Sequence, residues 1–244
     1  VSTGDISLNG ADLVDDLAAA RRLHEEIGVP YRAIPGNHDI GDNQETAKLQ
    51  RVNDERLARW RSVFPEDRWV FDAPGWRILA VNALVLGSDL AEAEAQAAFI
   101  AKAALLLLIH KPLFDHGPED DEVSGHFLTP GPRRQLLDAM GDVRPRLVLS
   151  GHLHEYRERS AAGMHNLWAP GTSFIVPDSS FLAYGGERTV GYVEADRAPD
   201  GSFAARLVRV PGMTVHNLGD IPQAYAEVHA RIALAKQAAG RAAV

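Results

Sequence analysis

Residues 147–156, LVLSGHLHEY, join a short apolar run to Gly151 and to two histidines, His152 and His154. A short apolar run that ends at a glycine is typical of a strand buried in a parallel sheet. Because residues i and i+2 of an extended segment point to the same face, both imidazoles can face one site, and Gly151 lets the backbone approach closely. Most histidines are not ligands, so the pair alone is equally compatible with two solvated loop side chains.

Other polar side chains that could bind a metal or take part in catalysis also follow apolar, β-like runs. They are Asp5, Asn37, His38, Asp39 and His110. Taken singly, each fits an ordinary turn or a hydrogen-bonded core position. Open α/β sheets bind ligands beyond the carboxyl ends of their strands, so we expect these side chains and the two histidines of GHLH to converge on one pocket. A set of oxygen and nitrogen ligands without sulfur suits Mn, Fe, Zn or a related divalent ion.

Helical and strand patterns alternate along the chain. Helical spacing and helix-stop residues predict helices over residues 10–30, 43–64, 132–141 and 224–243. Apolar β-like patterns predict strands at the start of 31–39, twice within 68–85, and over 105–110, 146–151, 165–174, 189–196 and 202–210. No repeat or composition break marks a boundary. We therefore expect a single domain over residues 1–244, a layered α/β domain with two sheets.

The composition of the 244-residue chain excludes several classes of protein. Its 45% hydrophobic and 24% charged residues are ordinary for a globular protein, and no stretch approaches the roughly 18–20 apolar residues that a membrane span requires. The net charge of -8 and the scattered basic residues argue against a nucleic-acid surface. With no cysteine, disulfides and thiol nucleophiles are excluded, and oxygen and nitrogen must hold any metal.

The order of the short motifs resembles a known family. GD at 4–5, GNHD at 36–39, a lone His110 after a buried strand and GHLH at 151–154 are similar to the motifs of the calcineurin-like metallophosphoesterases. The Asp-ending GNHD resembles the small bacterial branch of cyclic-nucleotide and glycerophosphodiester phosphodiesterases. The resemblance implies an α/β fold, a four-layer α/β/β/α sandwich of two mixed β-sheets flanked by helices, and a centre of two divalent metal ions (Mn, Fe, Zn or a mixture).

The resemblance also implies which residues hold the metals. Asp5 would bridge both ions. Asn37, His110 and His152 would complete the protein ligands of one ion, and His154 would bind the other. A carboxylate can bridge two ions, whereas a neutral imidazole cannot, and neutral ligands around one shared carboxylate leave the cluster net positive and attractive to a phosphate.

Two residues between these ligands would act on the substrate. By the resemblance, His38 contacts the scissile phosphate and stabilises or protonates the leaving oxygen, and Asp39 orients His38. Asn37 would touch substrate as well as metal. His116 and His126 lie in a Gly-, Pro- and acid-rich segment that we interpret as a loop over the pocket mouth, where contact with substrate competes with simple solvation.

The predicted function is a metal-dependent phosphohydrolase, with a phosphodiesterase as the favoured form, which would cleave small phosphodiesters or cyclic nucleotides by attack of a metal-bound hydroxide. Two ions about 3.5–4 Å apart supply hydroxide near neutral pH and neutralise an in-line phosphoryl transition state. The acidic residues DDE at 120–122 disfavour dianionic monoesters. A phosphomonoesterase or pyrophosphatase of the same family is the close alternative. A non-catalytic scaffold that binds a nucleotide or a protein partner is an alternative of another class.

Two features depart from the family pattern. The family begins with Asp-x-His at the end of a first strand, ahead of GD, and residues 1–3 are too short for a complete buried strand. The segment near Ala104 passes from helix-like to strand-like sequence without a turn residue. We therefore expect residues to be missing at both places. The rival interpretation is a degenerate site with a single metal.

The sequence carries few signals for cellular localisation or for assembly into oligomers. The chain shows no signal peptide, which favours the cytoplasm, although a leader ahead of Val1 would not be visible. The Ala-rich segment 224–243 is compatible with packing on the domain or on a second subunit, so a homo-oligomer stays open. The expected partner is a small phosphate-ester substrate.

Overall fold

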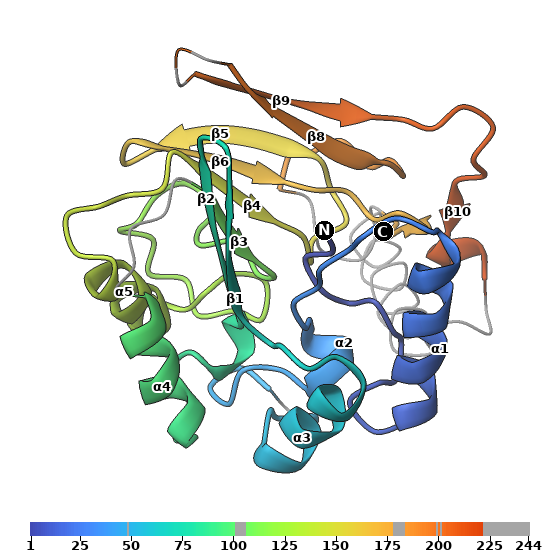
Figure 1. The fold of residues 1–244 in the computed structure, drawn as a ribbon, viewed down its shortest axis with the longest axis horizontal. Helices are drawn as coiled ribbons and strands as arrows, with labels where there is room; N and C mark the ends of the chain where they lie inside the picture. The colour runs from blue at the N-terminus through green and yellow to red at the C-terminus, as the bar shows by residue number, and fades with distance from the viewer. Residues whose placement is uncertain (48, 101–105, 178–183, 199, 201, 222–244) are drawn as a thin grey trace, which may run out of the picture. The chain divides into compact units, whose positions relative to one another are not determined.

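The computed structural model describes residues 1–221 except 48, 101–105, 178–183, 199 and 201 (Figure 1). The predicted helix over 224–243 and the expected gap near Ala104 lie outside the described residues. The chain divides into two compact units. Unit 1 comprises Val1–His152 and Arg159–Leu167, and unit 2 comprises Leu153–Glu158 and Trp168–Val244.

A six-stranded sheet forms the centre of unit 1. Its strands, in the order in which they lie side by side, are β1 (Trp69–Ala73), β2 (Trp76–Val81), β3 (Leu106–Ile109), β4 (Leu147–Ser150), β6 (Met164–Trp168) and β5 (Arg157–Ala161). The β1–β2 pair is antiparallel, whereas β2–β3 and β3–β4 are parallel. This mixed sheet with its flanking helices confirms the predicted α/β class.

The register of the central strands sets the position of the predicted ligands. Ile109 at the end of β3 lies opposite both Val81 of β2 and Ser150 of β4, so the three strands end level with one another. The next residues continue the pairing, because the Gly151 amide donates to the His110 carbonyl at 3.0 Å. The carboxyl ends of two parallel strands thus deliver their histidines to the same edge of the sheet.

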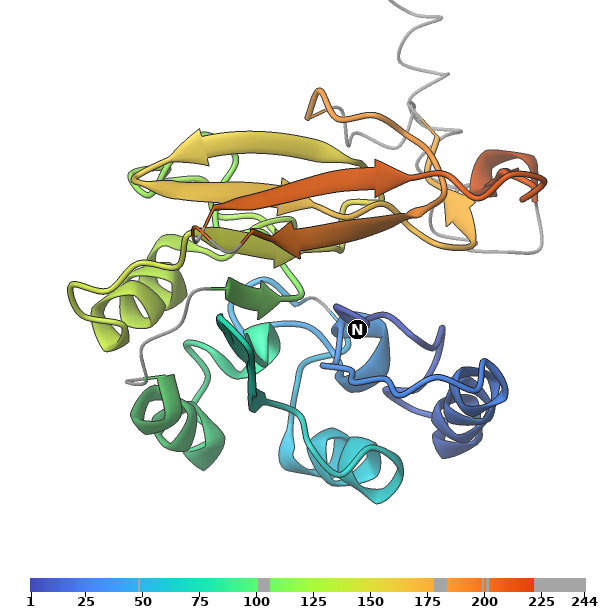
Figure 2. The same cartoon turned by 45° about the horizontal axis from the view of Figure 1, so that its top comes forward.

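Helices cover the sheet. They are α1 (Val14–Glu26), α2 (Asn37–Ile40), α3 (Asp54–Val63), η1 (Ala83–Val85), α4 (Ala91–Ile100) and α5 (Pro130–Ala139). Figure 2 shows the longer helices of unit 1 on the same side of strands β4, β5 and β6. The predicted apolar stripes account for this packing: α1 buries Leu17 and Ala20, and α3 buries Leu57 and Trp60.

The predicted helix over 43–64 is wrong in its first half. α3 begins only at Asp54, where the side chain of Asn53 caps the helix by accepting the amide of Arg56 at 2.9 Å. Upstream, the buried Asn43 side chain donates to the carbonyl oxygens of Ala83 and Leu84 at 2.8 and 3.1 Å. Tertiary hydrogen bonds from a short polar side chain therefore replace the helical pattern that the apolar spacing indicated.

The first residues form less regular structure than the sequence predicts. In place of a strand at 31–34, a single parallel bridge joins Ser2 to Ala33. Two hydrogen bonds support it, from the Ser2 amide to Arg32 and from the Ile34 amide to Ser2, at 2.8 and 3.2 Å. Strand β5 was not predicted, because its sequence RERSA carries charged residues in place of a clear apolar alternation.

Unit 2 contains two small sheets. β7 (Phe174–Ile175) and β10 (His216–Asn217) pair in parallel, and β8 (Tyr192–Arg197) and β9 (Phe203–Val208) form an antiparallel hairpin, followed by η3 (Leu218–Asp220). The hairpin confirms the two strands predicted there. Stacking of two sheets into four layers, and assembly into a homo-oligomer, stay predictions. Within the part of the chain described, no helix combines the length and apolar character needed to cross a membrane.

Candidate metal centre

Four of the five predicted metal ligands lie together in unit 1. Ligand atoms of Asp5, His110 and His152 are all within 4.8 Å of one another. The Nε2 atom of His110 lies 3.4 Å from Asp5 Oδ2 and 3.2 Å from Asn37 Oδ1. The first turn of the chain, the GNHD turn and the ends of β3 and β4 therefore converge as the sequence predicted.

Two glycines allow the first two turns to approach one another. Gly4 has a φ of 106°, and a Cβ atom there would lie 2.6 Å from both the Gly36 amide nitrogen and His110 Nδ1. A Cβ on Gly36 would lie 2.1 Å from Asp5 Oδ1. Neither position has room for a side chain, so these glycines fix the close packing that presents Asp5.

The backbone is strained at the predicted ligands. Among the described residues, the non-glycine residues with positive φ are Asp5 (53°), His152 (70°), His154 (55°) and Ala162 (51°). Such conformations cost on the order of 1–3 kcal/mol each and persist only where the surroundings hold them. Three of these four residues are predicted metal ligands, which is the pattern expected at a functional site.

Backbone carbonyl groups orient both imidazoles of the cluster. His110 Nδ1 lies 2.8 Å from the carbonyl oxygen of Thr3, and His152 Nε2 lies 2.9 Å from that of Gly125. A carbonyl oxygen only accepts, so each of these nitrogens carries a proton. At His152 this leaves Nδ1 with a free lone pair. His110 Nε2 instead faces the oxygens of Asn37 and Asp5 and can donate to them. His152 Nδ1 is buried and has no hydrogen-bond partner in the described part of the chain. Carbonyl-oriented imidazoles beside a carboxylate fit a divalent metal ion.

Asp39 is fully buried behind this cluster, and its carboxylate ties the two ligand turns together. One oxygen accepts the amides of Gly36 and Ile6 at 2.9 and 3.3 Å, and the other accepts the amide and hydroxyl of Ser7 at 3.0 and 2.6 Å. Ile6 and Ser7 directly follow Asp5 on one turn, and Gly36 directly precedes Asn37 on the other. Asp39 therefore holds together the two turns that carry the predicted ligands Asp5 and Asn37.

His38 is linked to the same turns. Its amide donates to Asp5 Oδ1 at 2.9 Å, and its Nδ1 atom lies 3.1 Å from the carbonyl oxygen of Leu8. The hydrogen bonds that the structure gives Asp39 go to the turns and not to this ring. An orienting role of Asp39 towards His38 stays a prediction, and on this geometry it would act through the turns.

The electrostatics of the cluster favour metal binding. Burial opposes the charge of Asp5, but the nearby His110 and other imidazoles outweigh it and lower the pKa of Asp5. Burial, with the charges of His110 and Lys111, lowers the pKa of His152 well below its usual value. Burial and the charge of Asp5 raise the pKa of Asp39 to about 6. Burial opposes the charge of His110, but Asp5 outweighs burial and raises the pKa of His110. The anionic Asp5 and the neutral His152 are in the protonation states that a metal ion requires, whereas a protonated His110 would release its proton when a metal binds.

The fifth predicted ligand, His154, belongs to unit 2. Its ring stacks on Phe174 with 4.7 Å between ring centroids, and a Cβ on Gly171 would lie 2.9 Å from His154 Nδ1. The ring is therefore held in place within its own unit. Its role as a ligand of the second metal stays a prediction.

His116 and His126, the predicted substrate contacts of the loop after β3, have local polar partners in the structure. The side chain of His116 is 70% exposed and its Nδ1 atom lies 3.0 Å from Asp115 Oδ2. The amide of His126 donates to Ser124 Oγ at 3.3 Å. Contact of either ring with substrate stays a prediction.

The sequence reasoning missed a buried ion pair beside the cluster. Lys111, the residue after His110, is fully buried, and its ammonium group lies 2.5 Å from Asp42 Oδ1. The pair ties the end of β3 to the segment after α2. A lysine within the apolar run LLLLIHKPLF was the available signal, because lysine is almost never fully buried unless it is paired.

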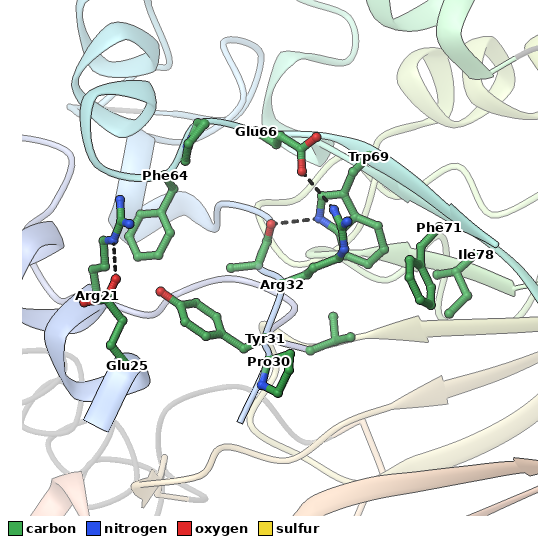
Figure 3. A pocket seen from close by; sticks show the side chains of 13 residues that line it. Arg21, Glu25, Pro30, Tyr31, Arg32, Phe64, Glu66, Trp69, Phe71 and Ile78 are labelled. Carbon is green, nitrogen blue, oxygen red and sulfur yellow. Dashed lines mark hydrogen bonds and ion pairs between the residues drawn. The ribbon is translucent and has the colours of Figure 1, made fainter. Parts of the chain in front are cut away.

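A separate aromatic groove of about 790 Å³ lies elsewhere in unit 1 (Figure 3). Tyr31, Phe64, Trp69 and Phe71 line it, and the Arg32 guanidinium carbon lies 5.3 Å from the Trp69 ring centroid and 5.4 Å from that of Phe71. None of the predicted metal ligands lines this groove. The groove is therefore distinct from the candidate metal centre.

No protein-family model matches the chain. Curated proteins do. A probable cyclic nucleotide phosphodiesterase of Psychrobacter arcticus is 23% identical over 222 residues, which cover 84% of this chain and 77% of the relative. Another, of Synechococcus sp., is 27% identical over 228 residues, 87% of this chain and 79% of the relative. Metallophosphoesterase 1 of Rattus norvegicus is 27% identical over 182 residues, 57% of this chain and 44% of the relative.

These similarities agree with the residues themselves. The ordered motifs and the four predicted ligands that meet in unit 1 agree with the names of these relatives. The chain is similar to cyclic nucleotide phosphodiesterases and to a metallophosphoesterase, at 23–27% identity.

Proposed function

We propose that the protein is a metal-dependent phosphodiesterase that cleaves small phosphodiesters, with cyclic nucleotides as the leading substrate class. The observation that carries the proposal is the cluster of Asp5, Asn37, His110 and His152, in which two imidazoles oriented by backbone carbonyls and one side-chain amide surround one carboxylate. The names of the two bacterial relatives support cyclic nucleotides as substrates.

The residues present fit divalent metal ions held by oxygen and nitrogen. Asp5 would bridge two ions, Asn37, His110 and His152 would complete the protein ligands of one, and His154 would bind the other. Bound Mn, Fe or Zn ions would polarise the phosphate and supply a nucleophile near neutral pH. The identity and number of the ions are part of the proposal.

The chain's own groups would position the substrate and move the proton. His38 is anchored through its amide to Asp5, so its ring is held close to the ligands. In the proposed reaction this imidazole donates a proton to the leaving alkoxide oxygen, the step that a general acid performs. Asn37, whose amide oxygen faces His110, would contact a phosphate oxygen through its amide nitrogen.

Charge around the site favours diesters over monoesters. The loop that follows His110 presents exposed acidic residues at Asp121 and Glu122, and the whole chain carries a net charge of -8. A dianionic phosphomonoester is repelled more strongly by these groups than a monoanionic diester. A phosphomonoesterase or pyrophosphatase is the second candidate.

The test compares hydrolysis of bis(p-nitrophenyl) phosphate and p-nitrophenyl phosphate by the natural full-length protein in added Mn(II). We expect faster cleavage of the diester, and loss of that activity in the His110→Ala variant. Faster cleavage of the monoester would favour the second candidate. No cleavage of either substrate by correctly folded protein with Mn(II) would contradict both and leave a non-catalytic scaffold.

A further inference from the structure

A closed loop between β3 and α5 supplies one of the groups that orient the metal ligands. Its neck is closed by the amide of Leu128, which donates to the carbonyl of Pro112 at 2.9 Å. Both ends of the loop are anchored by buried side chains: Leu113, Phe114, Phe127 and Leu128. Between them lies a stretch of more exposed residues that includes Gly125, whose carbonyl oxygen lies 2.9 Å from His152 Nε2.

A single guanidinium group holds this loop at its neck and at its middle. Arg133 of α5 is only 2% exposed. Its Nη1 atom donates to the carbonyls of Leu113 and Leu128, both at 3.2 Å, and its Nη2 atom donates to the carbonyl of Asp120. Burying a guanidinium is costly unless its donors are satisfied. Here the loop backbone satisfies both terminal nitrogens, whereas Nε is buried without a hydrogen-bond partner among the described residues.

The carboxylate of Asp120 organises the loop from inside. It accepts the amides of Asp115 and His116 at 2.9 and 2.7 Å through one oxygen and that of Gly117 at 3.3 Å through the other. Burial opposes its charge, but these backbone donors outweigh burial and lower the pKa of Asp120. The loop is thus fixed by Arg133 from outside and by Asp120 from within.

We infer that Arg133 is a positioning residue for the metal ligand His152, acting through the loop and the Gly125 carbonyl. The carbonyl keeps the proton on His152 Nε2 and leaves Nδ1 free to bind a metal. A group that hydrogen-bonds a metal-ligating histidine typically changes the affinity of the site for the metal by about 10–100-fold. The inference rests on the proposed metal centre and adds a residue that does not touch the metal or the substrate.

The first test compares Arg133→Met with Arg134→Met, the neighbouring and exposed arginine of α5. Mn(II) affinity is measured by the electron paramagnetic resonance signal of free Mn(II), and folding by thermal melting. We expect Arg133→Met to weaken Mn(II) binding about tenfold and Arg134→Met to leave it unchanged, with Arg133→Lys recovering part of the affinity. A folded Arg133→Met variant that binds Mn(II) like the wild type would overturn the inference.

A second variant and a spectroscopic measurement separate positioning from a merely structural role. Asp120→Ala loosens the loop without emptying a buried position, and it decides the question if Arg133→Met does not fold. In the metal-free protein, imidazole ¹⁵N shifts report which His152 nitrogen carries the proton. We expect the Nε2–H form in the wild type and a mixture in both loop variants; an unchanged tautomer and unchanged affinity in Asp120→Ala would refute the inference. Failure of the wild type itself to bind Mn(II) would contradict the metal centre, and the inference with it.

Discussion

The ligand cluster around Asp5 and the ion-pair network around Arg61 both hold charged groups in unit 1, yet their charges are balanced differently. In the network, Arg61 contacts Asp67 at 2.9 Å and Glu92 at 2.8 Å, and Arg68 contacts Glu92 at 2.7 Å. Each carboxylate of the network therefore has a permanent cation from the chain itself. Such a network is complete as it stands and needs no ligand.

The ligand cluster lacks this balance. Asp5 faces imidazoles and no guanidinium or ammonium group within ion-pair distance in the described part of the chain, and its backbone is held at a positive φ of 53°. His152 Nδ1 is buried without a hydrogen-bond partner among the described residues. Backbone strain and a buried ring nitrogen without a partner are retained in a folded protein where they serve function. The difference separates a cluster shaped for a ligand from one that stabilises the fold.

The sharpest test of this difference is Asp5→Ala. Bridging metal ligation supplies several kcal/mol of transition-state stabilisation, so we expect phosphodiester turnover to fall on the order of a thousandfold. The melting temperature of the metal-free variant should fall only modestly, because the His38 amide loses its acceptor and alanine tolerates the positive φ less well than aspartate. Steady-state kinetics and thermal melting in a chelator measure the two effects. A variant with wild-type turnover would break the distinction.

Metal removal tests the same cluster without mutation. A ligand that binds only the folded state stabilises it, by about 2.7 kcal/mol at a hundredfold excess over Kd. We expect the melting temperature of the wild type to rise on addition of Mn(II) and to return in a chelator, and we expect no rise in His152→Ala. Melting curves with and without Mn(II) measure this. An equal rise in the variant would mean that the metal binds elsewhere.

Asp67→Ala tests the ion-pair network, where we expect a loss of stability and not of activity. The Asp67 side chain is 5% exposed and receives Arg61 and the Asn82 amide, the latter at 3.1 Å. Removing one partner of a buried pair leaves the others unsatisfied, which we expect to cost about 2 kcal/mol of unfolding free energy, because Arg61 keeps partial access to water. Urea unfolding measures the loss. Turnover at 25 °C should stay within about twofold of the wild type; a large loss of turnover would contradict the separation of the two clusters.

Much of the ligand cluster could be predicted because its signals are local. Glycines and polar residues at the ends of apolar strands mark where a sheet delivers its ligands, and His110 and His152 follow this rule, whereas Asp5 follows only a short bridged segment. The orienting groups could not be predicted in the same way. They are the backbone carbonyls of Thr3 and Gly125, and a carbonyl has the same chemistry at every residue, so no residue type signals it.

Secondary-structure elements that depend on tertiary contacts also could not be predicted from the sequence. The apolar spacing of 43–64 indicates one helix, but the side chain of Asn43 finds carbonyl partners about forty positions along the chain and the helix starts at Asp54. Strand β5 is recruited to the edge of the sheet by β6 in spite of its charged sequence. Local patterns report which face of a segment is apolar, whereas these two outcomes depend on which partners arrive from elsewhere.

Glu92→Gln is the smallest and the most specific probe of the network. Hydrogen bonds from Arg61 and Arg68 lower the pKa of Glu92 from 4.5 to about 2. A carboxylate whose pKa is lower in the folded state stabilises the fold above its unfolded pKa, and the stabilisation is lost as the pH falls from about 4.5 towards 2. We expect the variant to be about 1 kcal/mol less stable at pH 7, since the pair is partly screened by solvent. The difference from the wild type should shrink steadily as the pH falls from about 4.5 towards 2.

The matched control is Glu55→Gln. Its carboxylate pairs with Arg59 four residues along α3, but its side chain is 80% exposed. An exposed pair of this kind contributes about 0.3–0.5 kcal/mol, so the control should show little change at any pH. Urea unfolding between pH 2.5 and 7 measures both variants. Equal, small losses of unfolding free energy in both variants would mean that the network around Arg61 is an ordinary surface feature. The contrast with the ligand cluster would then rest only on the backbone strain at Asp5 and on the ring nitrogen of His152 that is unpaired in the described part of the chain.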